Sequence, residues 1–201
     1  MTTEEIILQA ARKVFREKGL EGSRMQEIAD EAGINKALLH YYFRSKDKLF
    51  MKIFSEAIQS MLPSVRISLQ EVETLNQFLS FFVHEYLKLL NELPWLPRFI
   101  LQEVNRNPKL IKDIMGNREL PINEIDRLIR RDTEKGLIMP ISAEHLMVNV
   151  ISMIIFPFAA RPVIQTLIFK DDEHAYKQFL IDRSEQITQF VLRSISIQSK
   201  P

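Results

Sequence analysis

The chain has 201 residues, of which 46% are hydrophobic and 26% charged, with a net charge of +1 and no cysteine. A chain of this length and apolar content can bury a sizeable core, which excludes a fully disordered protein. The absence of cysteine excludes disulfides, thiolate metal sites and cysteine nucleophiles, and it fits a reducing compartment.

The N-terminus begins Met-Thr-Thr-Glu-Glu and lacks a basic-then-apolar leader. No stretch approaches about 18 uncharged apolar residues, the length that a spanning helix needs. We therefore expect no signal peptide, no membrane partner and a cytoplasmic location.

Positive charge is concentrated in one short segment. Residues 1–33 hold five Lys or Arg against seven Asp or Glu, a balance of −2, whereas residues 34–52 hold five bases against Asp47 alone, a balance of +4. Such a cluster is either a solvated surface or a site that meets phosphate.

Apolar residues recur at helical spacing along almost the whole chain, which predicts an all-α fold. Thr2 and Glu5 are spaced as a capping box for a first helix that stops at Gly19, and Pro63 should bend or end the long helix that starts near Lys46. The other expected breaks are at Pro157 and Pro162. The expected helices cover residues 3–18, 46–63, 71–91, 94–106, 108–115, 119–135, 143–156 and 173–196, with two short helices between the first pair.

Catalytic motifs are missing. All five glycines fall at expected helix ends or turns, so none is left for a phosphate-cradling GxxxxGK or a dinucleotide-binding GxGxxG loop, and GxSxG and HExxH are absent. The four histidines are scattered. We expect no catalytic residue, no metal site and no cofactor, and we predict that the protein is not an enzyme.

Residues 23–43, SRMQEIADEAGINKALLHYYF, are typical of a helix-turn-helix. Ser23 can cap a helix whose Met25, Ile28 and Ala29 face inward, and Gly33 supplies the tight bend. Asn35 then caps a second helix, in which Leu38 or Leu39 and Tyr42 return to the core. The outward positions of that helix are Lys36, Ala37, His40 and Tyr41, and a ridge of this kind fits a major groove.

Four short stretches of this region together resemble the N-terminal signature of the tetracycline-repressor (TetR) family of transcriptional regulators. They are Ile28-Ala29, Ala32-Gly33-Ile34, Tyr42-Phe43 and Ser45-Lys46-Asp47-Lys48-Leu49. The rest of the chain matches the family only in size and helical pattern. The resemblance implies a three-helix DNA-binding domain at residues 1–48 and a helical effector-binding and dimerisation domain at residues 49–201.

The resemblance also implies residue roles. Lys36, Ala37, His40 and Tyr41 would line the groove face, and Tyr42 and Lys46 would contact phosphate. Arg24 stands where a threonine is common and His40 where a phosphate-contacting tyrosine is common, but either side chain can donate to phosphate. The full set assigned to double-stranded DNA is Arg24, Met25, Asn35, Lys36, Ala37, His40, Tyr41, Tyr42 and Lys46.

Two apolar faces near the C-terminus predict a homodimer, which a palindromic operator with half-sites about 34 Å apart requires. The expected interface residues are Leu146, Val150, Ile154, Ile187, Phe190 and Val191. The alternative is that both faces fill the core of a single chain.

A middle region rich in bulky apolar residues predicts an effector pocket, although most of these side chains can equally be core. By resemblance, a small apolar or amphipathic effector would lower operator affinity by changing the geometry of the dimer. The expected lining is Phe81, Trp95, Arg98, Phe99, Gln102, Met115 and Phe156.

The predicted function is therefore a ligand-responsive transcriptional regulator, with repression as the preferred output. Two alternatives stay open. One is a helical-bundle lipid carrier or an enzyme acting on an apolar substrate, and the other is a helical adaptor whose turn motif contacts protein.

Overall fold

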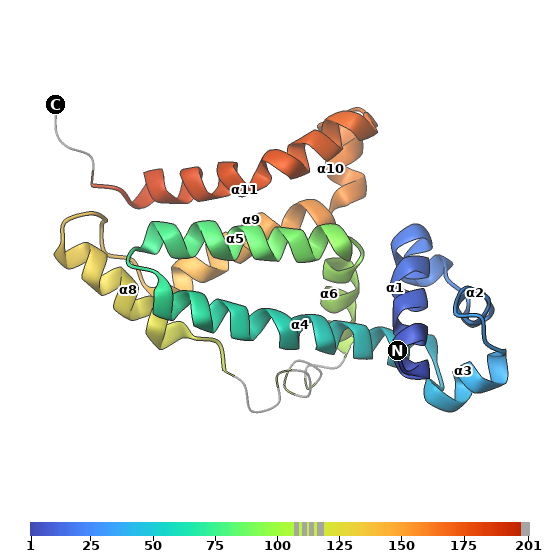
Figure 1. Cartoon of the computed structure of the whole chain (residues 1–201). Helices are drawn as coiled ribbons and strands as arrows, with labels where there is room; N and C mark the ends of the chain where they lie inside the picture. The colour runs from blue at the N-terminus through green and yellow to red at the C-terminus, as the bar shows by residue number, and fades with distance from the viewer. Residues whose placement is uncertain (107–108, 110–111, 113–114, 116–118, 198–201) are drawn as a thin grey trace. The chain divides into compact units, whose positions relative to one another are not determined.

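The computed structural model describes residues 1–106, 109, 112, 115 and 119–197, and it is helical throughout (Figure 1). Among these residues, the one β-type pairing is an isolated antiparallel bridge between Ile138 and Ser196. The all-α prediction is confirmed. The expected helix at residues 108–115 lies largely outside the described residues.

The chain divides into two compact units. The first unit comprises Met1–Ser60 and Leu89–Gly116, and the second comprises Met61–Lys88 and Asn117–Pro201. The first contains α1 (Thr3–Gly22), α2 (Met25–Glu31), α3 (Lys36–Tyr42), the start of α4 (Lys46–Glu71) and α6 (Leu96–Arg106). The second contains the rest of α4, most of α5 (Leu75–Glu92), α8 (Ile122–Glu134), α9 (Ala143–Ala159), α10 (Arg161–Leu167) and α11 (Glu173–Ile195).

Local sequence signals explain where α1 begins and bends. Thr2 and Glu5 form the expected capping box, in which the Thr2 N–H donates to Glu5 Oε2 at 2.7 Å and the Glu5 N–H donates to Thr2 Oγ1 at 3.2 Å. Gly19 adopts a left-handed φ of 68°, as expected of a stop, but a last turn follows it and α1 continues to Gly22.

Rings and aliphatic side chains fill the core of the first unit. Phe50 lies 5.8 Å from Phe15, 4.3 Å from Trp95 and 3.7 Å from Phe99, measured between ring centroids. These contacts join α1, the start of α4 and the α5–α6 region. The compact unit around the helix-turn-helix is therefore larger than residues 1–48, because α4 and the α5–α6 region supply most of its aromatic core.

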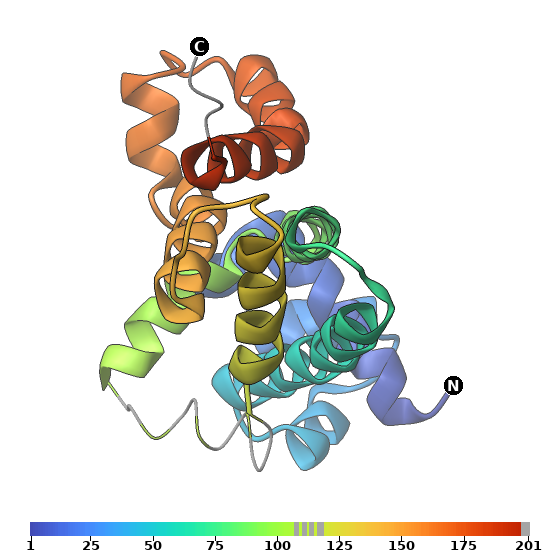
Figure 2. The same cartoon turned by 90° about the vertical axis from the view of Figure 1, so that its left-hand side faces the viewer.

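Helix α9 is the central element of the second unit. It packs against α8, α10 and α11, as Figure 2 shows for α8 and α11. Pro157 does not break it. The helix runs on to Ala159, and Pro162 instead lies in the first turn of α10, where its missing N–H has no helical partner to lose.

None of the described helices is long and apolar enough on its own to cross a membrane. In the part of the chain that the structure describes, α9 and α10 taken together meet the length and composition required, but they are bent by 75° at the break between them.

Candidate nucleic-acid interface

A buried apolar contact holds α2 and α3 together at the turn. Ile28, Ala29 and Leu39 are fully buried, and the Ile34 N–H donates to the Ala29 carbonyl at 3.0 Å across the turn. Gly33 has a φ of 67°, which side chains with a Cβ rarely adopt, so glycine fits this bend. The two short helices are thus fixed as one block (Figure 1).

Asn35 begins α3 as predicted. Its Oδ1 accepts the Leu38 N–H at 2.8 Å, which satisfies one of the amides that a helix start leaves without a backbone partner. The cap also fixes the rotation of α3, and with it the set of side chains that faces outward.

The outward face of α3 is the predicted one. Lys36, Ala37, His40 and Tyr41 are all exposed, and Tyr41 is 81% exposed. An aromatic ring left in solvent on a short helix is free to contact a partner.

The core-facing set differs from the prediction at one place. Of the two alternative leucines, Leu39 is the buried one, but Phe43 rather than Tyr42 returns to the core, since Tyr42 is 40% exposed. Phe43 ends α3 with an extended backbone (φ −132°), which turns its ring inward. Tyr42 instead lies against Tyr41 with ring centroids 5.5 Å apart, so both tyrosines belong to the exposed surface.

Acidic groups of α2 are paired with bases of α1. Lys18 Nζ lies 2.8 Å from Glu27 Oε1, and Lys13 Nζ lies 2.7 Å from Glu31 Oε1. The hydrogen bond from Lys18, with a second from the Arg24 N–H, holds the pKa of Glu27 below its usual value. The hydrogen bond to Glu31 raises the pKa of Lys13.

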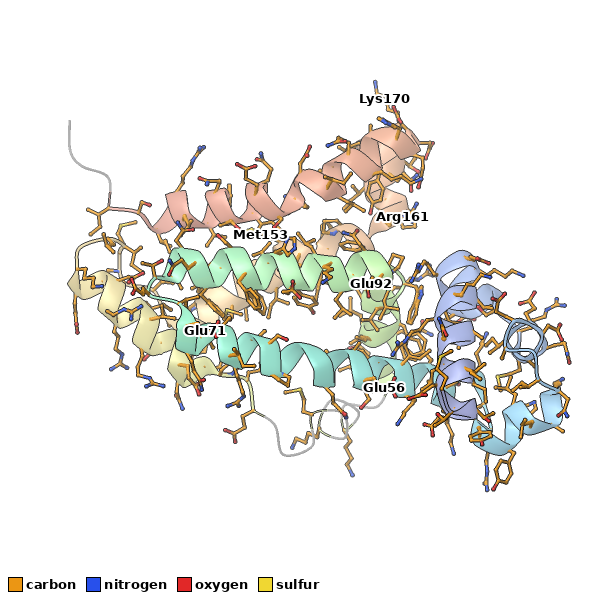
Figure 3. All side chains as sticks on the ribbon, in the orientation of Figure 1. Glu56, Glu71, Glu92, Met153, Arg161 and Lys170 are labelled. Carbon is orange, nitrogen blue, oxygen red and sulfur yellow. The ribbon has the colours of Figure 1, made fainter. Side chains whose placement is uncertain are left out.

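Further pairs join α1 to α4. Arg12 Nη2 lies 2.9 Å from Glu56 Oε2, and Glu56, labelled in Figure 3, also lies 3.6 Å from Lys52 Nζ. By contrast, within the described part of the chain, Lys36, Arg44 and Lys48 have no ion-pair partner. The unneutralised positive charge therefore lies at and just after α3.

Lys46 is held by backbone carbonyls. Its Nζ donates to the Ser23 carbonyl at 3.1 Å and to the Glu21 carbonyl at 3.5 Å, so it joins the start of α4 to the segment between α1 and α2. The Arg24 N–H, at the start of α2, donates to Glu27 Oε2 at 3.0 Å. No local pattern predicts the Lys46 contact, because 23 residues separate Lys46 from Ser23.

Known proteins share this architecture. The sequence profile described as "Bacterial regulatory proteins, tetR family" matches residues 7–53. The chain is 25% identical over 181 residues to the "Probable HTH-type transcriptional regulator YttP" of Bacillus subtilis, covering 88% of this chain and 86% of that protein. It is 28% identical over 148 residues to the HTH-type transcriptional regulator RutR of Escherichia coli K12, covering 71% and 68%.

The profile match at residues 7–53 and these two relatives together support a TetR-family transcriptional regulator.

A solved structure agrees with this TetR-family fold along nearly the whole chain. The transcriptional regulator FadR of Bacillus subtilis, solved in complex with stearoyl-CoA, superposes with a TM-score of 0.63 at 17% identity, covering 94% of this chain and 97% of FadR. The two sequence relatives are transcriptional regulators, and this supports the same DNA-binding function for this chain.

The residues predicted to line an effector pocket are distributed over both units of the chain. Trp95 and Phe99 pack against Phe15 and Phe50 inside the first unit. Phe81 and Phe156 line two different pockets of the second unit, of about 430 and 560 Å³. Of the remaining three, Arg98 and Gln102 are exposed on α6, and Met115 is half-buried.

Five of the six residues predicted at the dimer interface fill the regulator's own core instead. They are no more than 3% exposed in the single chain, so a second chain cannot reach them; Phe190 alone, at 64%, lies at the surface. Helices α9 and α11 each have apolar residues on both a buried and an exposed face, and the spacing of apolar residues along the sequence does not distinguish the two faces. The buried five are Leu146, Val150, Ile154, Ile187 and Val191.

Proposed function

We propose that this regulator binds a palindromic DNA operator as a homodimer, represses transcription there, and is released by a small apolar or amphipathic effector. The observation that carries the proposal is the exposed face of α3. This capped helix projects Lys36, His40 and Tyr41 beside positive charge that the described residues do not neutralise. A short helix presented in this way fits the major groove.

The proposed contacts divide into two kinds. Lys36, Ala37, His40 and Tyr41 read base edges, whereas Arg24, Tyr42 and Lys46 meet phosphates. Met25 and Asn35 stand at the starts of α2 and α3 and flank the same groove.

Selection from genomic fragments tests the proposal. The purified protein should enrich fragments that share one palindrome, and the affinity should fall steeply as the salt concentration rises, because phosphate contacts release counterions. A helical carrier, an enzyme or a protein-binding adaptor should enrich no shared sequence.

Substitutions within α3 test which side chains contact bases and so determine the preferred sequence. Lys36→Ala and His40→Ala should each change the preferred base at one operator position, at a cost of roughly 1–3 kcal/mol per lost base contact. Titration against specific and scrambled duplexes measures this preference. An equal loss of affinity on both duplexes would overturn the assignment of these two residues.

The effector site belongs to the second unit in this proposal. That unit contains the described pockets lined by Phe81 and Phe156, and its α4 segment continues the same helix that starts in the first unit. An effector that displaces α4 acts on a helix whose Leu49 and Phe50 are buried beside the helix-turn-helix. The stearoyl-CoA bound by FadR supports an amphipathic ligand.

The proposed dimer uses the exposed sides of α9 and α11. Each carries large apolar side chains that are more than 60% exposed, and unburied side chains of this size mark an interaction surface. The set is Val148, Phe156, Ile181 and Phe190. We also propose a cytoplasmic location and no enzymatic activity, as expected of a regulator that works on DNA.

A further inference from the structure

A pocket of about 710 Å³ lies between the C-terminal half of α4 and α8, within the second unit. Glu71, labelled in Figure 3, marks the end of α4 beside it. We call it the arginine pocket, because three guanidinium groups line it against a single carboxylate, an excess of two positive charges. Its lining is Arg66, Leu69, Gln70, Val72, Glu124, Arg127, Leu128 and Arg131.

Among the described residues, these arginines have only distant ion-pair partners, and Arg127 has none. Arg66 Nη2 donates to the Glu119 carbonyl at 2.7 Å, and Arg66 Nη1 is 3.9 Å from Glu124 Oε1, too far for a hydrogen bond. Arg127 has neither a hydrogen bond nor an ion pair with any described residue. Each guanidinium has five N–H donors, so most of them remain free.

Arg131 is fixed but incompletely satisfied. Its Nη2 donates to the Glu73 carbonyl, while its Nε is buried without a hydrogen-bond acceptor. The Asp132 carboxylate is the counter-charge of Arg131, but its Oδ1 lies 3.9 Å from this Nε, too far for a hydrogen bond, while its Oδ2 accepts the Leu75 N–H at 2.7 Å. A buried donor without an acceptor costs free energy, which a bound oxyanion would recover.

Two of the three arginines also repel each other. Arg127 and Arg131 are four residues apart on α8 and therefore neighbours on one helix face, where like charges repel. Arg66 adds a third positive charge from α4. Planar guanidinium groups bind carboxylate and phosphate oxygens in pairs, so three of them around one hollow match an oxyanion.

The same pocket has an apolar side. Leu69, Val72 and Leu128 belong to the lining beside the arginines, and they can contact hydrocarbon rather than charge. A ligand that carries both an oxyanion and an apolar portion would satisfy both kinds of surface.

We propose that the arginine pocket binds an amphipathic ligand through its oxyanion, a carboxylate or a phosphate ester, held by Arg66, Arg127 and Arg131. The proposal also makes this ligand the effector, in the arginine pocket rather than in the pockets lined by Phe81 and Phe156, and in that respect it rests on the proposed function. Because Arg66 is on α4, binding draws α4 toward α8 and so acts on the helix that begins in the first unit.

Calorimetric titration of the full chain tests the site with three probes whose carbon chains each have eight carbons, the carboxylate carbon included: octanoate, octyl phosphate and uncharged octyl glucoside. The charged probes should bind, and a higher salt concentration should weaken their binding; the uncharged probe should bind at least tenfold more weakly. The affinity for octanoate compared with that for octyl phosphate shows whether the pocket prefers a carboxylate or a phosphate ester. Binding of the uncharged probe as tight as that of both anions, or no binding of either anion, would overturn the proposal.

Arg127→Gln is the decisive variant, because Arg127 supports no described contact and its loss should leave the fold intact. It should weaken binding of the charged probes about tenfold, with partial recovery in Arg127→Lys. Arg130→Gln is the matched control. It removes the same charge from α8 at a side chain that does not line the pocket; Arg130 pairs with Asp126 at 2.7 Å and is 74% exposed. An equal loss of affinity for the charged probes in both variants would mean that only the overall charge of α8 matters, and it would contradict the proposed site.

Measuring operator affinity with and without the anion tests the regulatory role separately from the existence of the site. The bound anion should lower operator affinity of the wild type and not of Arg127→Gln. If the anion binds in an Arg127-dependent way and the operator affinity stays the same, the site is upheld and its role as effector site is overturned. If no operator is found, the proposed function fails while the calorimetric result for the pocket still holds.

Discussion

Two side chains predicted to contact DNA form hydrogen bonds with backbone groups of the helix-turn-helix region. Asn35 caps α3, and Lys46 ties the start of α4 to the Ser23 carbonyl. The sequence predicts a DNA-binding role for both residues, and both have a structural role in the protein without DNA. Their effects on stability and on DNA binding must therefore be measured separately.

Asn35→Ala should lower the free energy of unfolding by about 1 kcal/mol, because the Leu38 amide loses its acceptor. Thermal unfolding followed by circular dichroism measures the effect. Asn35→Ser is the control, since its hydroxyl oxygen can accept the same hydrogen bond and should restore most of the stability. A serine variant as unstable as the alanine variant would argue against the cap.

Lys46→Ala should weaken binding to specific and scrambled duplexes alike, and it should also lower the stability by about 1 kcal/mol through loss of the carbonyl contacts. Lys48→Ala removes the same charge two residues away, from a side chain without a described partner. It should weaken DNA binding without lowering the melting temperature. Equal melting temperatures of the two variants would show that the carbonyl contacts contribute nothing.

At the scale of helices, a tertiary contact offsets what sequence rules disfavour at one proline. Pro63 and Pro157 are expected to end or bend helices, yet α4 and α9 continue through both. Pro157 has no N–H to donate to the Met153 carbonyl four residues earlier, and that carbonyl instead accepts a hydrogen bond from Arg183 Nη2 at 3.0 Å. This contact also ties α9 to α11.

Helix α10 is joined to the first turn of α11 by charge. Arg161, labelled in Figure 3, donates to Glu173 Oε1 at 2.8 Å and Oε2 at 3.0 Å, and Gln165 donates to the same carboxylate. The hydrogen bond from Arg161, followed by that from Gln165, holds the pKa of Glu173 below its usual value. The charged carboxylate is thus favoured in the folded state.

Acidification should therefore weaken this link. A carboxyl whose pKa is lowered on folding stabilises the protein above its unfolded pKa, and that contribution is lost as the pH falls toward the folded pKa. The melting temperature of the wild type should exceed that of Glu173→Gln at neutral pH, and the gap should narrow between about pH 5 and pH 3. Glu185→Gln, on the exposed side of α11, should show no such narrowing, and a gap independent of pH for Glu173→Gln would contradict the assignment.

For the whole molecule, the proposed dimer is the property on which operator binding depends. Phe190→Glu places a charge on the proposed interface and should shift the protein from dimer to monomer at micromolar concentration, as measured by size exclusion with light scattering. Leu120→Glu changes a residue that is 54% exposed outside α9–α11, and it should leave the dimer intact. A monomeric wild type, or an unchanged Phe190→Glu dimer, would count against this interface.

Local sequence is sufficient for the helical class, most helix starts and the exposed set on α3. These features depend on short-range physics: the Thr2 and Asn35 caps, the Gly33 bend and apolar spacing all act within a few residues. The family signature lies in the same region, so the helix-turn-helix and its outward side chains can be predicted from neighbouring residues alone.

Packing between distant segments, by contrast, sets which apolar faces are core and which charges remain unpaired. Leu146 and Val148 both suit an apolar helix, but packing against neighbouring helices buries one and exposes the other. Trp95 and Phe99, expected in a pocket, instead complete a ring cluster with Phe15 and Phe50, and the arginine pocket joins residues more than 50 positions apart. Contacts of this kind depend on how whole helices pack, and spacing along one helix carries no information about its partner.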